Sequence, residues 1–188
     1  LSPYDHEGRN TTNRYPGFSF HVNAHKFGQA MKNACKYPIK EIQKKVMQVN
    51  YDDNGVESIV LEDGDVLQGD VYFDCTGFQR LLIGELTEWN SYFPNIPNNR
   101  AIAGTAVTDL PFKPCTQAFA QKDGWIWKIP TAERWGSGFV YSSDHTTDDE
   151  AEERIVNFYA DQGIKYEPVR RIKFDAGRCN QVAVKNVI

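Results

Sequence analysis

The chain of 188 residues is 40% hydrophobic and 24% charged, a composition typical of a globular protein that can bury one sizeable core. Its formal net charge is -4, and its one basic cluster is Arg170, Arg171 and Lys173, which excludes the electrostatic footprint of a protein that binds nucleic acid or an anionic membrane. No run of about 18 apolar residues is present, so the sequence predicts no membrane-spanning helix.

The first part of the chain predicts a helix followed by a meander of short strands. Residues 1–17 are polar and rich in turn-forming residues, and Asn23 then stands at an N-cap position before apolar residues at helical spacing. An Asp-Asp-Asn-Gly turn at 52–55 separates two of the strands. The predicted elements are a helix over 24–36, a partly exposed strand over 39–51, and strands over 56–61 and 66–67.

A short apolar run over 71–73 predicts a buried strand. It leads directly into Asp74-Cys75-Thr76-Gly77, which reads as a small, flexible turn because glycine permits unusual backbone angles and close approach. Phe78 follows, and then Gln-Arg-Leu-Leu-Ile over 79–83. A plain turn at a strand end and a backbone placed against a ligand are both compatible with this segment.

The second half of the chain predicts an antiparallel sheet and one helix. The aromatic-rich segment 84–99 reads as a loop. Thr147 and Glu150 form a capping box before a helix that ends near Gly163. The predicted strands are residues 101–107, 115–121, 124–129 and 137–142, followed by short final strands at 172–174 and 182–184.

Two tryptophans, Trp125 and Trp127, lie two residues apart in one predicted strand and therefore project from the same face of the sheet. Such a pair can cover a core or line the path of a ligand. Lys128 alternates to the opposite face, where we expect it to be exposed to solvent.

The cysteines and histidines give no pattern of a metal centre. Four cysteines lie far apart without a Cys-x-x-Cys pair, which excludes a zinc site and a disulfide framework and indicates the reduced thiols of a cytoplasmic protein. His21 and His25 stand four residues apart but lack a third ligand, so they, like His6 and His145, are expected to serve as caps or surface residues.

The order of the motifs resembles the flavin-dependent tryptophan halogenases. That family has an Asp-Cys-(Ser or Thr)-Gly turn before an Arg-Gly-Leu-Leu-Ile run, and then a Trp-x-Trp-x-Ile-Pro strand. Residues 74–83 and 124–130 of this chain are similar to both. Further similar segments are Phe20-His21-Val22-Asn23-Ala24, the Pro-Asn-Asn-Arg-Ala run over 97–101, the Ser-Gly-Phe-Val-Tyr run over 137–141, and residues 178–188.

The resemblance implies an α/β fold with α+β character, made of part of an FAD/NAD(P)-binding flavoprotein fold and an antiparallel substrate-side sheet. It places a partial FAD-binding domain at 1–83 and a partial substrate-side region at 84–188, which returns to the flavin domain near 172–188. No Gly-x-Gly-x-x-Gly turn occurs in the sequence, and the chain begins with Leu1 rather than Met, so we interpret it as a central fragment.

The resemblance also implies cofactors, partners and roles for residues. The family uses FAD as FADH2, oxygen and a halide ion, receives its flavin from a separate reductase, acts on a small aromatic substrate, and allows a homodimer. The implied cofactor-binding residues are Val46, Asp74, Cys75, Thr76 and Gly77. The implied wall of the substrate route consists of Trp125, Trp127, Ile129 and Pro130.

The family's catalytic lysine and glutamate lie in motifs that are absent from this sequence, so we expect no catalytic residue within the chain and no activity from the chain alone. Two alternatives remain at this point. One is a flavin-dependent monooxygenase or reductase of the same superfamily, and the other is a non-catalytic binding module that keeps the aromatic wall without a flavin.

Overall fold

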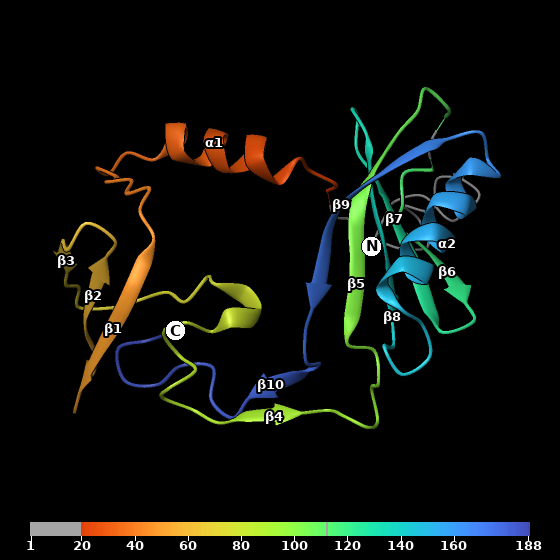
Figure 1. The fold of residues 1–188 in the computed structure, drawn as a ribbon. Helices are drawn as coiled ribbons and strands as arrows, with labels where there is room; N and C mark the ends of the chain where they lie inside the picture. The colour runs from red at the N-terminus through yellow and green to blue at the C-terminus, as the bar shows by residue number, and fades with distance from the viewer. Residues whose placement is uncertain (1–19, 112) are drawn as a thin grey trace, which may run out of the picture. The chain divides into compact units, whose positions relative to one another are not determined.

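A computed structural model describes residues 20–111 and 113–188 (Figure 1). The expectations for residues 1–17 and for His6 lie outside the described residues. Within these ranges the protein contains two α-helices and three sheets whose strands pair antiparallel. The fold is therefore mixed α/β with mainly antiparallel sheets, which agrees with the α+β character that the sequence predicted.

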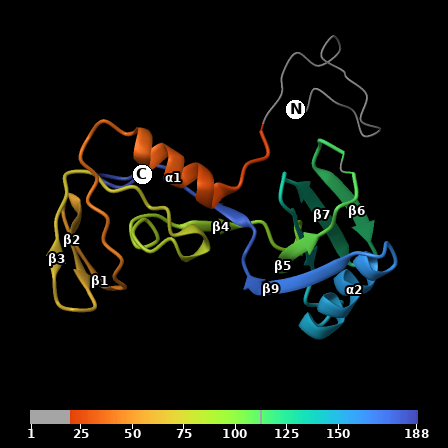
Figure 2. The ribbon, with the colours of Figure 1, turned by 90° about the horizontal axis from the view of Figure 1, so that it is seen from above.

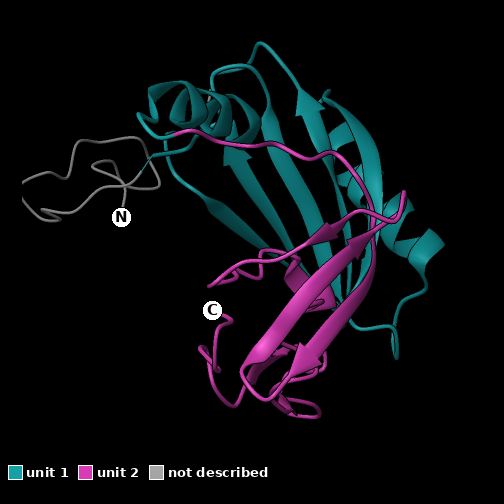
Figure 3. Cartoon of the chain, turned by 90° about the vertical axis from the view of Figure 1, so that its left-hand side faces the viewer, with its two compact units in different colours: residues 1–37, 98–174 teal, residues 38–97, 175–188 magenta. Residues whose placement is uncertain are grey.

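The described chain divides into two compact units (Figure 3). Unit 1 comprises residues 20–37 and 98–174, and unit 2 comprises residues 38–97 and 175–188. Each unit therefore combines segments that are remote in sequence. The assignment of residues 1–83 and 84–188 to flavin-binding and substrate-side regions stays a prediction.

Unit 1 is built on a five-stranded antiparallel sheet in the order β6-β7-β8-β5-β9. The four strands predicted in this region are all present, with ends shifted by one to two residues. Their bounds are β5 Arg100–Val107, β6 Gln117–Gln121, β7 Gly124–Pro130 and β8 Trp135–Tyr141. Consecutive strands β6, β7 and β8 form a meander, as their short Gly- and Pro-containing connections predict.

The fifth strand, β9 Lys165–Lys173, runs beside β5 at the edge of the sheet (Figure 2). The sequence predicted a strand only at 172–174, because Pro168 and the charged residues around it are unusual in a central strand. At an edge, however, the missing N–H of proline costs no ladder hydrogen bond. The register also shifts between Ala103 and Gly104, so that Val169 forms a bulge beside Pro168.

Helix α2, Asp148–Ala160, covers one face of this sheet. The predicted capping box is present: the Thr147 side chain accepts a hydrogen bond from the Glu150 N–H, and the Glu150 carboxylate accepts one from the Thr147 N–H at 2.8 Å. The helix ends at Ala160, before Gly163, whose φ is +70°. The core between helix and sheet consists of Ile102, Ala106, Ile126, Trp135, Phe139, Tyr141, Ala151, Ile155, Tyr159, Ile164 and Tyr166.

Helix α1, Ala24–Ala34, also belongs to unit 1 and begins at the predicted N-cap, where the Asn23 side chain accepts a hydrogen bond from the Lys26 N–H. It is two residues shorter than predicted. Its apolar residues Phe27 and Met31 are 53% and 58% exposed, and no residue of the helix is buried. Among the described residues, no helix is long and apolar enough to cross a bilayer.

Unit 2 contains a three-stranded meander of β1 Val46–Asp52, β2 Gly55–Leu61 and β3 Val66–Leu67. The strand predicted over 39–51 is therefore wrong for residues 39–45, which have no regular structure. A second pair, β4 Trp89–Ser91 with β10 Gly177–Cys179, lies partly in the segment that was predicted as a loop. The buried residues of this unit's core are Val56, Tyr72, Leu82, Ile83 and Val187.

Two predicted strands of unit 2 are wrong. At 71–73 only Tyr72 is buried, and it forms a single parallel bridge with Val187, whereas Val71 and Phe73 are 54% and 68% exposed. Alternation explains this result, since one face of the run packs against the core and the described chain leaves the other face uncovered. At 182–184 a turn closed by Val184 and Val187 replaces the predicted strand.

Candidate functional site

Asp74 organises the segment that follows it in unit 2. One carboxylate oxygen accepts hydrogen bonds from the Thr76 backbone N–H at 3.0 Å and from the Thr76 hydroxyl at 2.6 Å. The other accepts from the N–H groups of Leu82 at 2.8 Å and Ile83 at 2.9 Å. The Thr76 hydroxyl in turn accepts from the Leu81 N–H at 2.8 Å. Residues 74–83 therefore form a loop that is closed by its own hydrogen bonds; we call this segment the Asp74 loop.

The hydrogen bonds of the loop determine the charge of Asp74. Burial alone would raise the pKa of its carboxyl group, but the hydrogen bonds donated by Thr76, Ile83 and Leu82 favour the carboxylate and lower the pKa overall. The loop therefore carries a negative charge that is fully engaged by its own donors. Such a carboxylate serves as a structural anchor and is poorly suited to proton transfer.

Two residues of the Asp74 loop have positive φ angles. Gly77 begins the short 3-10 helix η1 Gly77–Gln79 with a φ of +64°, and Arg80 follows it with a φ of +48°. A Cβ atom on Gly77 would meet no atom within 4 Å, so the backbone conformation explains this glycine, and the space beside it is open. Cys75, Thr76 and Gly77 are exposed, which leaves the backbone of the loop accessible.

Arg80, near the C-terminal end of the Asp74 loop, makes a contact with an aromatic ring. The Arg80 guanidinium lies 4.0 Å from the centre of the Trp89 ring on β4. The indole N–H of Trp89 donates a hydrogen bond of 2.9 Å to Asp175, and the Ser91 hydroxyl donates one of 2.6 Å to the same carboxylate. The left-handed residue of the loop is thus stacked on a ring that is itself fixed in place.

Asn186 connects strand β2 to the segment that precedes the Asp74 loop. Its side-chain amide donates to the Val56 carbonyl at 2.8 Å and accepts from the Val56 N–H at 2.9 Å, so it pairs with β2 as a neighbouring strand would. The Asn186 carbonyl accepts a hydrogen bond from the Tyr72 N–H at 2.8 Å, immediately before the loop. Sequence reasoning missed Asn186; its one signal was the resemblance, since it falls at an asparagine of the family's pattern.

Val46, the remaining predicted cofactor residue, is half-buried at the start of β1 and pairs with Leu61. The same strand reaches the Asp74 loop through Tyr51, whose hydroxyl donates a hydrogen bond of 3.0 Å to the Leu82 carbonyl. The structure thus places all five predicted cofactor residues in unit 2. Their contact with a flavin stays a prediction.

The second feature of interest is the face of the unit 1 sheet opposite α2, which we call the open face. Trp125 and Trp127 of β7 both lie on it, with ring centroids 6.0 Å apart and planes inclined by 58°. Trp125 is 42% exposed and Trp127 is half-buried. The alternation of β7 places the pair on the face opposite the buried core of the described residues. That the pair lines the path of a ligand stays a prediction.

The four predicted wall residues separate between the two faces of the sheet. Ile129 shares the open face with the tryptophans and is half-buried. Pro130 is buried on the α2 side, and its carbonyl contacts the His21 ring nitrogen Nδ1 at 2.8 Å. The other ring nitrogen of His21 lies 3.2 Å from the Thr116 hydroxyl, so this histidine anchors the segment before α1 to the sheet.

Lys128 does not lie in solvent, contrary to the prediction. Its side chain is 9% exposed, and its ammonium group lies 3.7 Å from the centre of the Trp135 ring. Burial, assisted by the positive charge of Lys113, lowers the pKa of the Lys128 amine. The alternation was predicted correctly, but the face opposite the tryptophans is the one that carries the core.

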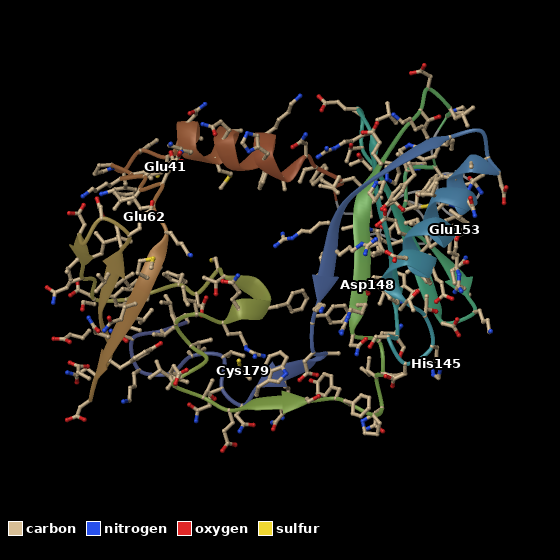
Figure 4. The ribbon with its side chains drawn as sticks, in the orientation of Figure 1. Glu41, Glu62, His145, Asp148, Glu153 and Cys179 are labelled. Carbon is tan, nitrogen blue, oxygen red and sulfur yellow. The ribbon has the colours of Figure 1, made fainter. Side chains whose placement is uncertain are left out.

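Among the described residues, no group of three or more His, Cys, Asp or Glu side chains could hold a metal ion. His145 lies in the loop before α2, Asp148 and Glu153 lie on that helix, and Cys179 lies on β10 (Figure 4). Asp148 accepts a hydrogen bond of 2.7 Å from the buried Tyr141 hydroxyl, which ties the start of α2 to the sheet.

The sequence also shows clear similarity to proteins of known activity. A family model described as tryptophan halogenase matches residues 3–188. Tryptophan 7-halogenase RebH of Lentzea aerocolonigenes is 31% identical over an alignment that covers all of this chain and 36% of that protein. Tryptophan 6-halogenase SttH of Streptomyces toxytricini is 28% identical, again over all of this chain and 36% of that protein.

Solved structures agree with this similarity. Tar14, a tryptophan C-6 flavin-dependent halogenase from taromycin biosynthesis, has a TM-score of 0.78 and 32% identity, covering 100% of this chain and 40% of that chain. BrvH, a flavin-dependent halogenase from Brevundimonas sp. BAL3, has a TM-score of 0.67 and 30% identity over 88% of this chain and 34% of that chain.

The chain spans about a third of the length of the curated relatives it matches. The family model, by contrast, matches nearly every residue of the chain, and it confirms the resemblance inferred from the Asp-Cys-Thr-Gly and Trp-x-Trp-x-Ile-Pro motifs. The chain therefore belongs to the family of flavin-dependent tryptophan halogenases.

Proposed function

We propose that the protein of which this chain forms a part halogenates an indole or another electron-rich aromatic, using FADH2, oxygen and a halide ion. The observation that carries this proposal is the open face of the unit 1 sheet. There two indoles stand on a strand whose opposite face already supplies the core, in a chain that matches tryptophan halogenases along its length.

In this proposal unit 2 is the part of the chain that meets the flavin. The exposed backbone of Cys75, Thr76 and Gly77 fits a flat ring system, because hydrogen bonds to Asp74 close the loop and the space beside Gly77 is free of other atoms. Val46 would lie at the adenine end of the cofactor. Reduced FAD would supply the two electrons that bring oxygen to the oxidation level of peroxide, which is the oxidant that the halide requires. Asp74 would hold the loop in position for this contact without exchanging protons itself.

The unit 1 sheet is the proposed substrate side. Trp125, Trp127 and Ile129 would form an apolar wall along the route between the flavin and the aromatic substrate. Pro130, which is buried on the other face, would hold the end of the strand through its contact with His21. Indole rings are bulky and rigid, so such a wall keeps other arenes away from the cofactor while small oxidised halogen passes.

The experiment requires the full-length protein, purified and supplied with FAD, NADH and a flavin reductase from a separate source. A panel of arenes headed by tryptophan, which the names of the relatives indicate, is incubated with chloride or bromide in air. The expected product carries one halogen, identified from its isotope pattern in mass spectrometry, and forms only with halide and reductase present.

Two other outcomes would contradict the proposal. Hydroxylated products that form equally well without halide would identify a monooxygenase of the same superfamily. Tight binding of an arene without any turnover, and without a flavin that co-purifies with the full-length protein, would identify a binding module. Residues 1–188 tested alone are expected to give no product with any halide.

A further inference from the structure

Trp127 lies in a row of very small residues on the open face. Reading across the sheet from β6 to β5, its neighbours in the row are Ala118, Gly138 and Ala103. A Cβ atom placed on Gly138 would overlap the Cη2 and Cζ2 atoms of the Trp127 ring and the carbonyl oxygen of Ile102. The outer edge of the indole therefore lies against Gly138, which is buried.

The residue before Gly138 holds Trp127 from the opposite side of the sheet. The Ser137 hydroxyl donates a hydrogen bond to the Trp127 carbonyl, and it accepts one of 2.7 Å from the Tyr159 hydroxyl of α2. Tyr159 stacks on Tyr166, with ring centroids 5.2 Å apart, and both tyrosines are buried. Ser137 thus holds the backbone of Trp127 by a hydrogen bond on the α2 side of the sheet, and Gly138 lies against the Trp127 ring on the open face.

Gly136 provides a natural comparison within the same strand. It lies on the open face two residues from Gly138, opposite Ile129. A Cβ atom on Gly136 would meet only the Ile129 carbonyl oxygen, at 3.8 Å, which is an ordinary contact. The crowding at Gly138 therefore comes from the Trp127 ring and the Ile102 carbonyl oxygen, and Gly136 meets neither of them.

We propose that Gly138 is a specificity-determining residue: by letting the Trp127 indole lie against the sheet, it sets how much room the open face leaves for an aromatic substrate. This inference rests on the proposed function of the wall. A methyl group at position 138 would lift the indole away from the sheet and narrow the route. A smaller ring at position 127 would uncover Gly138 and widen the route.

The test compares four variants of the full-length protein: Gly138→Ala, Gly136→Ala as its matched control, Trp127→Phe, and the double variant Gly138→Ala with Trp127→Phe. The measured quantity is the ratio of kcat/KM for a two-ring arene, such as tryptophan, to that for a one-ring phenol. We expect Gly138→Ala to lower this ratio about tenfold, the scale of one carbon in a tight apolar pocket. We expect Trp127→Phe to raise the ratio and Gly136→Ala to leave it unchanged.

The double variant separates specificity from general damage. Phenylalanine lacks the two ring atoms that a methyl group at position 138 would meet, so the double variant should recover the ratio that Gly138→Ala loses. The overlap with the Ile102 carbonyl oxygen remains in the double variant and should lower kcat/KM for both arenes equally. A loss of kcat/KM that is equal for both arenes and is not rescued would mean that Gly138 serves only the packing of the sheet. Should Gly138→Ala fail to fold, an unchanged ratio in Trp127→Phe would overturn the proposal by itself.

A second readout does not depend on turnover. Acrylamide quenching of Trp127 is obtained as the difference in fluorescence between each protein and its Trp127→Phe derivative. We expect stronger quenching of Trp127 in Gly138→Ala than in the wild type or in Gly136→Ala. If the wild type makes no halogenated product, the proposed function fails; if it does, and both the ratio and the quenching are the same in the Gly138→Ala and Gly136→Ala proteins, this inference alone fails.

Discussion

Arg80 has a left-handed backbone at a position where the family's pattern has the glycine of Arg-Gly-Leu-Leu-Ile. Its φ is +48°, which costs a non-glycine residue about 1 kcal/mol. The guanidinium contact with Trp89 returns about 0.5 to 1 kcal/mol of this cost. The side chain thus compensates for a backbone conformation that its own Cβ disfavours.

Substitution at Arg80 separates the two effects. Arg80→Gly removes strain and stacking together and should leave the stability of the Asp74 loop nearly unchanged. Arg80→Ala keeps the strain without the stacking. It should lower the local unfolding free energy of the loop by about 1 kcal/mol relative to Arg80→Gly. Amide hydrogen exchange of residues 77–84 in the full-length protein measures the difference. Equal exchange in the two variants would show that the left-handed backbone carries no strain.

Asp74 makes the stability of the loop depend on pH. Because its folded pKa is lowered from the ordinary value of 3.8, the carboxylate stabilises the folded loop at neutral pH, and this contribution is lost as the pH falls through the lowered pKa. Asp74→Asn replaces one acceptor by a donor facing N–H groups and should cost about 1 to 3 kcal/mol at pH 7.

The measurement for Asp74 is the local unfolding free energy of wild type and Asp74→Asn between pH 7 and pH 2. The difference between them should shrink as the pH falls below 3.8, because the carboxyl group is protonated first in the unfolded loop and only at lower pH in the folded one. Asp53→Asn, on an exposed residue of the hairpin turn, serves as the control for loss of one negative charge. A difference that is constant over the whole range would show that ionisation of Asp74 does not support the loop.

At the scale of elements, the capping box of α2 is the clearest local feature. Thr147→Ala removes the side-chain oxygen that satisfies the Glu150 N–H and should destabilise unit 1 by about 1 kcal/mol. Glu153→Gln changes an exposed residue of the same helix beyond its first turn and should have little effect. Denaturant unfolding followed by the near-UV signal of the buried tyrosines compares the two; a cost at Glu153 equal to that at Thr147 would argue against the cap.

The elements also show where sequence patterns succeed. The helices and the strands of the meanders, apart from residues 39–45, were predicted closely, because caps, turns and period-2 alternation act within a few residues. Strand β9 was missed over 165–171, since the suitability of Pro168 depends on its position at the edge of a sheet. The strand predicted at 182–184 was wrong because Val184 pairs with Val187 across a turn instead of with a neighbouring strand.

At the scale of the whole molecule, apolar side chains remain uncovered in both units. They include Phe27 and Met31 on α1, Phe73 before the Asp74 loop, and Trp125 on the open face. Exposed apolar surface of this kind favours association. Residues 1–188 prepared alone should therefore self-associate in a concentration-dependent way, as measured by size-exclusion chromatography with light scattering. A monodisperse monomer that unfolds cooperatively would contradict this prediction.

The sequence by itself determined the family, both helices, most strands and the shared face of Trp125 and Trp127, because motifs and periodicities depend on neighbours along the chain. Only the tertiary structure decided which face of β7 is covered by the core. Lys128 lies on the covered face, so it is buried and not exposed as predicted, and the two indoles lie on the face away from the core. It also revealed Gly138 beneath Trp127 and Asn186 behind the Asp74 loop. These contacts join residues that are 11 or more positions apart, and their geometry depends on the packing of whole elements, which no local pattern records.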